Sequence, residues 1–136
     1  MISRLDNEFQ FSQTALNLRA YRQELLASNI ANADTPHFKA RDIDFKSSLQ
    51  TALGQSGNSA GPLELAQTSE RHLQGEGGNR FGATVKYRNE YQSSVDGNTV
   101  NMDVERAAFA ENAIHMEALL TFVRTQFKDL SAAVQP

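Results

Sequence analysis

The chain has 136 residues and a formal net charge of −3 at pH 7, with a sequence pI of about 5.6. Its Lys and Arg residues are scattered, which argues against nucleic acid as a partner and against a basic helix on a membrane surface. Because the chain contains no Cys, disulfides, thiolate metal sites and Cys nucleophiles are excluded.

The glycines divide the chain, because all eight lie between Gly54 and Gly97. Glycine weakens helix interiors and favours irregular backbone. We therefore expect helical ends and a loose middle within one domain, since a chain of this length has no room for two cores. The expected segments are an N-terminal helix (1–33), a turn, extended segment and short helix (34–53), a flexible middle with a possible strand (54–100) and a C-terminal helix (101–134).

The first helix is predicted from about Arg4 to Asn32 or Ala33, and it carries two apolar faces. A helix on the surface of a small domain normally has a single apolar stripe. The additional face therefore indicates that more than one layer packs against this helix. At about 100° per residue, one face contains Phe11, Leu18, Tyr21 and Leu25, and the other contains Leu5, Phe9, Leu16, Ala27 and Ile30.

A run of turn-forming residues, 29–36 (NIANADTP), ends this helix. Its Asn, Asp and Thr residues prefer turns to helix interiors, and Pro36 disfavours helical geometry at Thr35. The run is a helix end followed by a turn, and Asn29 and Asn32 could in addition bond neighbouring subunits. The two interpretations are compatible.

The middle of the chain is predicted to have little regular structure. Residues 38–45 alternate only in part between apolar and polar, which favours an extended segment, and a short helix through Leu49 is expected to follow. Residues 54–80 are rich in Gly, Ser, Gln and Asn, as is typical of a linker or mobile loop. Residues 84–88 (TVKYR) suit a short strand, and residues 96–98 (DGN) suit a turn.

The last helix is predicted to begin near Asn101 or Asp103, since either residue is a suitable N-cap. It carries the clearest pattern in the chain, an apolar series with alternating spacings of four and three residues. Such a series is typical of a coiled-coil seam. The series runs through Phe109, Ala113, Met116, Leu120, Val123, Phe127, Leu130 and Val134, with Met102 one heptad before it.

The two terminal helices are expected to pair as an antiparallel, coiled-coil-like hairpin, giving a mainly α fold. Pairing buries one apolar face of each helix and leaves the second apolar face in water. Exposing apolar surface is unfavourable by about 25 cal/mol per Å². Either the middle segment supplies a third layer, or other subunits cover these faces. We favour other subunits, because the middle is Gly-rich and poor in large apolar residues.

No catalytic, cofactor-binding or metal-binding constellation is evident, so we expect a protein that is not an enzyme. The histidines His37, His72 and His115 are not expected to pair with one another or with a carboxylate as metal ligands. Asp42 and Asp44 form the nearest acidic pair, and a pair near a helix start is more often capping or solvated than catalytic.

The first residues lack the apolar core of a secretory signal, and no run approaches 18 apolar residues. From this we expect either a cytoplasmic protein or export by a route that does not use a signal peptide.

Five segments resemble flagellar rod and hook proteins, and in particular the proximal rod proteins. The first is 28–36 (SNIANADTP) at the end of the first helix, which is similar to a signature of that family. The others flank it at 18–27 (LRAYRQELLA) and 39–45 (KARDIDF), or precede and enter the last helix at 96–103 (DGNTVNMD) and 109–112 (FAEN). The resemblance covers roughly residues 11–45 and 96–130.

The resemblance implies a structural subunit of the bacterial flagellar basal-body rod, which assembles helically and transmits torque from motor to hook. It also implies export without a cleavable signal peptide, by the flagellar type III apparatus, and a place in the periplasm. The implied partners are other copies of the chain, other rod proteins and an adaptor at the MS-ring and export-gate end, with no cofactor, nucleic acid or direct membrane insertion.

The family pairs its N- and C-terminal helices in a tube wall, so we expect interface and packing residues on both helices and the turn between them. These residues are Phe11, Leu18, Tyr21, Leu25, Asn29, Ile30, Asn32, Asp34, Thr35, Pro36, Phe38, Ile43, Phe45, Met102, Phe109, Met116, Leu120, Val123, Phe127 and Leu130.

Two residues depart from the family pattern. His37 stands where the family often has Gly, which would be strained if the turn needs a positive φ and tolerated in a type I turn. Asn101 stands where Asp is common, which removes a charge and keeps an N-cap. A rival interpretation is a soluble coiled-coil binding module, such as an export chaperone or adaptor, which would explain the heptads and leave the signature at 28–45 unexplained.

Overall fold

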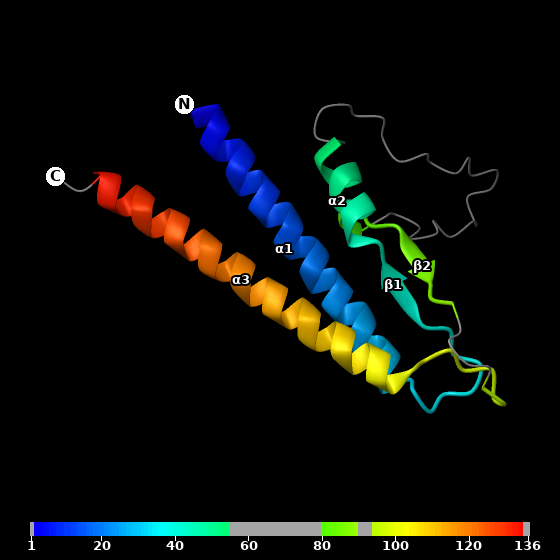
Figure 1. Cartoon of the computed structure of the whole chain (residues 1–136). Coiled ribbons are helices and arrows are strands. Elements are labelled where there is room, and N and C mark those ends of the chain that lie inside the picture. Colours follow the sequence, from blue (N-terminus) through cyan, green and yellow to red (C-terminus); the bar gives the residue numbers. More distant parts are fainter. Residues whose placement is uncertain (1, 55–79, 90–93, 135–136) are drawn as a thin grey trace, which may run out of the picture.

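The computed structural model describes residues 2–54, 80–89 and 94–134, and the expected linker at 54–80 lies almost wholly outside these ranges. Figure 1 shows the arrangement of the elements along the chain. The elements are α1 (Ile2–Ala31), β1 (Arg41–Ile43), α2 (Phe45–Gly54), a 3-10 turn (Arg80–Gly82), β2 (Val85–Tyr87) and α3 (Met102–Val134).

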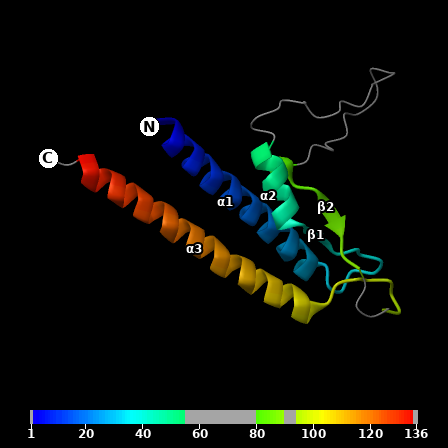
Figure 2. The ribbon, with the colours of Figure 1, turned by 45° about the horizontal axis from the view of Figure 1, so that its top comes forward.

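The long helices α1 and α3 lie side by side and run in opposite directions, so both chain termini lie at the same end of the molecule (Figure 1). The predicted antiparallel helical hairpin is therefore confirmed. The two helices are close where α1 ends and α3 begins, and they diverge toward the chain termini (Figures 1 and 2). The small layer of α2, β1 and β2 packs on another side of α1.

The start of α3 is fixed by an N-cap. The side-chain oxygen of Asn101 accepts hydrogen bonds from the backbone N–H groups of Asp103 and Val104, at 3.1 and 3.3 Å. These are donors that the first helical turn cannot satisfy by itself. Asp103 and Glu105 place negative charge in that first turn, where the helix dipole favours it.

The segment that follows α1 forms a strand and then a helix. Strand β1 pairs with β2 in an antiparallel register that places Arg41 opposite Tyr87 and Ile43 opposite Val85. The expected extended segment at 38–45 thus ends early, because Phe45 is already helical. Asp44 causes the change, since its carboxylate accepts a hydrogen bond from the backbone N–H of Ser47 at 3.2 Å and so caps α2.

The hydrophobic core lies between α1 and the small layer. Leu18 and Leu25 of α1 are buried against Ile43 of β1 and against Ala83. Tyr21, Phe45, Leu49 and Val85 are partly buried around them. The alternative in which the chain itself supplies a third layer therefore holds for Leu18 and Leu25, and our preference for other subunits was wrong at these two positions.

Other parts of the two helices remain uncovered by the described chain. Phe11, on the same face of α1 as Leu18 and Leu25, is 43% exposed. On α3, four large apolar side chains are at least half exposed. These are Ile114, Phe122, Phe127 and Val134.

Candidate assembly surface and its polar anchor

A partly buried charged cluster joins both strands to both long helices. The guanidinium of Arg22 on α1 donates two hydrogen bonds to the carboxylate of Asp42 on β1, at 2.9 and 3.0 Å. Arg88, just after β2, donates to the same carboxylate and also to Glu105 on α3, the latter at 2.7 Å. The four side chains alternate in charge, so each is paired with a partner of opposite sign.

Glu105 is fully buried although it is charged, and its second oxygen is also satisfied. The side-chain amide of Asn29 donates to this oxygen at 3.1 Å and to the carbonyl of Arg41 at 2.8 Å. The Asn29 side-chain oxygen in turn accepts from the backbone N–H of Arg41 at 3.1 Å. Because a buried charge is tolerated only when it is paired and hydrogen-bonded, this cluster fixes where α3 begins on α1.

The electrostatics of the cluster favour its charged state. Burial alone would raise the pKa of Asp42, but the hydrogen bonds from Arg22 and Arg88 outweigh burial and hold this pKa below its ordinary value. The hydrogen bond to Asp42 raises the pKa of Arg22 in the same way. Asp42 is thus neither a capping nor a solvated residue, which corrects our expectation for Asp42, whereas Asp44 caps α2 as expected.

A second polar contact joins the end of α1 to the segment before α3. The side-chain amide of Asn98 donates to the carbonyls of Asn32, Ala33 and Thr35, at 3.0, 2.7 and 3.0 Å. These carbonyls lie in the turn just after α1, and those of Asn32 and Thr35 also accept from the backbone N–H groups of Thr35 and Phe38. Asn98 is itself oriented, because its side-chain oxygen accepts from the backbone N–H of Val100 at 2.8 Å.

A third polar contact lies one heptad after Glu105, at the fully buried Asn112. Its side-chain amide donates to the carbonyl of Arg19 at 2.9 Å and to the side-chain oxygen of Gln23 at 2.6 Å. Arg19 donates back to Asn112 at 3.3 Å and stacks over the ring of Phe45 at 3.9 Å. Burial lowers the pKa of Arg19.

Asn29 was among the expected interface residues, whereas the buried roles of Asn98, Glu105 and Asn112 were missed in the sequence. The predicted seam from Phe109 to Val134 lies beside the most buried line of α3, which passes through Glu105, Ala108 and Asn112. The available signal was a polar residue repeated at the heptad spacing from 105 to 112, flanked by apolar positions. A single buried polar residue in a helix pair commonly fixes the register, and this spacing was the pattern to search for.

The expected interface residues differ widely in exposure. Leu18, Leu25, Asn29 and Ile43 are buried within the chain. Those that are partly buried are Tyr21, Ile30, Asn32, Phe38, Phe45, Met102, Phe109, Met116, Leu120, Val123 and Leu130. Those that are exposed are Phe11, Asp34, Thr35, Pro36 and Phe127. Which of them contact neighbouring subunits stays a prediction.

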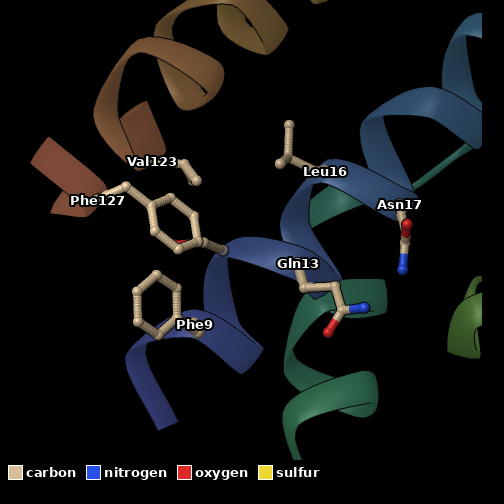
Figure 3. A pocket seen from close by; sticks show the side chains of 7 residues that line it. Phe9, Gln13, Leu16, Asn17, Val123 and Phe127 are labelled. Carbon is tan, nitrogen blue, oxygen red and sulfur yellow. The ribbon is translucent and has the colours of Figure 1, made fainter. Parts of the chain in front are cut away.

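A pocket of about 350 Å³ opens between α1 and α3 in the half of the hairpin that contains the chain termini (Figure 3). The rings of Phe9 and Phe127 lie 5.0 Å apart at one of its walls. Ser12 is 2% exposed, and its hydroxyl has no hydrogen-bond partner among the described residues. The pocket is lined by Phe9, Ser12, Gln13, Leu16, Asn17, Val123 and Phe127.

The described part of the chain contains no group of three or more side chains suited to hold a metal ion. One expectation is corrected, because His115 does meet a carboxylate one turn away, at 3.7 Å from Glu111 on the surface of α3. A membrane-spanning helix is also not found among the described residues.

The turn between α1 and β1 takes the strained form considered for His37, whose φ is 60°. The backbone N–H of His37 donates to the carbonyl of Asp96 at 3.0 Å, so this turn is held against the segment before α3. A type I turn, which has negative φ at its central residues and would tolerate His, does not form here.

Comparison with known proteins identifies the family. Residues 9–39, which cover most of α1 and the turn after it, match the family of flagella basal body rod proteins. The chain is 47% identical over 135 residues to the flagellar basal body rod protein FlgB of Proteus mirabilis, covering 99% of this chain and 98% of that one. With the same coverage, it is 44% identical to FlgB of Salmonella typhimurium and 42% identical to FlgB of Escherichia coli. The chain therefore belongs to the FlgB family of flagellar basal-body rod proteins.

Proposed function

We propose that this structural rod subunit assembles with further copies of itself and with other rod proteins into a helical rod that transmits torque from motor to hook. The observation that carries the proposal is the exposure of large apolar side chains on both long helices, among them Phe11, Ile114, Phe122 and Phe127. Contact with neighbouring subunits would remove this surface from water, which is favourable.

Torque transmission needs a stiff contact between subunits, which long helices are suited to make. Close-packed side chains resist sliding, because a slide breaks contacts before new ones form. The charged cluster around Glu105 and the amide of Asn98 hold the start of α3, the end of α1 and the small layer in one orientation. A contact between different faces of successive copies, if it does not close on itself, builds a filament.

The proposal extends to location and partners. A rod subunit of this kind would be exported by the flagellar type III apparatus without a cleavable signal peptide. It would then assemble in the periplasm next to an adaptor at the MS-ring and export-gate end. The net charge of −3 and the scattered basic residues support protein partners rather than nucleic acid. We propose no cofactor, no direct membrane insertion and no enzymatic activity.

The test is to place a charge on the apolar part of α3. Leu120→Asp or Phe127→Asp should abolish rod assembly, because a carboxylate cannot be buried unpaired between subunits. Motility in soft agar and the amount of the protein in purified basal bodies measure the effect. Gln50→Asp, on the exposed surface of α2, is the matched control and should assemble normally. Normal swimming of both α3 variants would contradict the proposal.

The rival role as an export chaperone or adaptor is not supported by the relatives, which are rod proteins. Cell fractionation separates the two roles. A rod subunit is retained in basal bodies after detergent extraction, whereas a chaperone stays in the unassembled fraction.

A further inference from the structure

One apolar stripe of α1 extends beyond the layer that covers it. Phe11, Leu18 and Leu25 are spaced by seven residues and share a face of the helix. Leu18 and Leu25 are buried under the small layer, whereas Phe11 is 43% exposed. The first turns of α1 extend past α2 in both views of the molecule (Figures 1 and 2). Phe11 is therefore an aromatic side chain that the described part of its own chain leaves partly uncovered.

The pocket between α1 and α3 lies on the opposite side of the same helix. Phe9 and Gln13, which line the pocket, are each two residues from Phe11, or about 200° around the helix axis. At about 350 Å³, the pocket is much larger than the roughly 10–15 Å³ that a cavity needs to hold one water molecule. Figure 3 shows Phe9, Leu16, Val123 and Phe127 around it together with the polar Gln13 and Asn17, so its walls are mainly apolar with a polar side. A pocket of this size and chemistry suits an aromatic side chain.

The aromatic pair in the pocket wall also favours an aromatic occupant. Phe9 and Phe127 would gain from a third ring, because aromatic side chains pack favourably edge to face.

We infer that Phe11 of one copy inserts into the pocket between α1 and α3 of a neighbouring copy in the rod, an inference that rests on the proposed function. A second copy is the occupant, because this chain carries both halves of the contact, a partly exposed aromatic ring and a mainly apolar pocket. The halves lie on opposite faces of α1, so each copy receives one neighbour and enters another. Such a head-to-tail contact can repeat without closing.

The absence of native Cys allows a clean cross-linking test. Phe11→Cys and Gln13→Cys are placed on two differently tagged copies, co-expressed with the wild-type chain so that rods assemble. In purified basal bodies, oxidation should join the two tags in one disulfide-linked dimer. Positions 11 and 13 face apart on one helix, so this disulfide cannot form within a copy without distortion. In the matched control, a copy with Lys46→Cys on α2 is used in place of the Phe11→Cys copy. Together with the Gln13→Cys copy, it should give no disulfide-linked dimer.

A second measurement keeps the aromatic ring at position 11. Phe11 is replaced by a photoreactive phenylalanine analogue, again co-expressed with the wild-type chain, and the adducts formed in purified basal bodies are mapped by mass spectrometry. Adducts at 9–17 or 123–127 of a second copy support the inference, and Leu16→Trp, which fills the pocket, should reduce them at least about fivefold.

The outcomes distinguish a failure of the proposed Phe11 contact from a failure of the proposed rod function. Protein present in basal bodies with no adduct, with adducts elsewhere, or with dimers joined through position 11 of both copies overturns the inference and leaves the rod function standing. Protein absent from basal bodies overturns the proposed function and the inference with it.

Discussion

At the scale of single residues, Asn98 has the most direct structural role of the side chains missed in the sequence. It is almost fully buried, and its amide serves three carbonyls at the end of α1. Asn98→Ala leaves these acceptors without that donor and should lower the free energy of unfolding by about 1–3 kcal/mol.

Urea denaturation followed by circular dichroism measures the loss. Asn89→Ala removes the same amide from an exposed position and should change stability by less than about 0.5 kcal/mol. Equal effects of the two substitutions would show that the carbonyl contacts carry no special stability.

His37 and Gly97 both have positive φ, at 60° and 72°, which strains His37 but not glycine. A Cβ added to Gly97 would lie 3.0 Å from Nδ1 of His37. Gly97→Ala should therefore cost about 1–2 kcal/mol, from the left-handed backbone and this contact together. His37→Gly should recover part of the loss, because it removes the imidazole and relaxes its own φ. A double-mutant cycle measured by thermal unfolding separates the two contributions, and purely additive effects would exclude the contact.

At the scale of elements, the charged cluster makes the contact between the strands and the helix pair dependent on pH. The pKa of Asp42 is lower in the folded chain than in the unfolded chain. Its ionised form therefore stabilises the fold above the unfolded pKa of about 4, and that stabilisation is lost as pH falls through the folded pKa. Acidification below about pH 4 should loosen β1 and β2 from α1 and α3.

The substitution Asp42→Asn tests this dependence. The variant should be less stable at pH 7 by about 2 kcal/mol, because Arg22 loses its carboxylate and Arg88 keeps only Glu105. Between about pH 5 and pH 2 it should lose less stability than the wild type, as measured by urea denaturation across the range. Asp44 and Asp96 keep some acid dependence in both proteins, because backbone hydrogen bonds lower the pKa of each. Parallel pH profiles would contradict the role of Asp42.

At the scale of the whole molecule, support is uneven along the helix pair. The half of the pair near Glu105 and Asn98 is fixed by polar contacts and by the small layer. Toward the termini the helices diverge, and Phe11, Phe127 and Val134 are left exposed. In the isolated protein these ends should fray, because long helices depend on tertiary packing for most of their stability.

Circular dichroism of the purified chain at low concentration checks the fraying. We expect less helix than α1, α2 and α3 would give if fully formed, with the missing helix at the diverging ends. Hydrogen exchange should locate fast exchange near Phe9 and Leu130 and slow exchange near Asn29 and Ala108. Full helicity with a sharp two-state melt at low concentration would contradict the dependence of the ends on neighbours.

The sequence alone determined the helical hairpin, the end of α1 and a cap for α3 at Asn101 or Asp103, because these follow from local rules. Helical periodicity, the turn residues before Pro36 and the N-cap Asn101 all act within a few residues. The family could be recognised for the same reason, since its signature at 28–36 is continuous along the chain.

Only the tertiary structure decided which faces the chain covers for itself. Burial of Leu18 and Leu25 requires β1 and β2 to pair across more than 40 positions, as between Arg41 and Tyr87, and no local pattern encodes such a pairing. The buried Glu105 was hidden for the same reason, since its charge is tolerated only where Asn29 and Arg88 meet it. The helical periodicity of the sequence shows that a face is apolar. Contacts between residues distant in sequence determine what packs against that face.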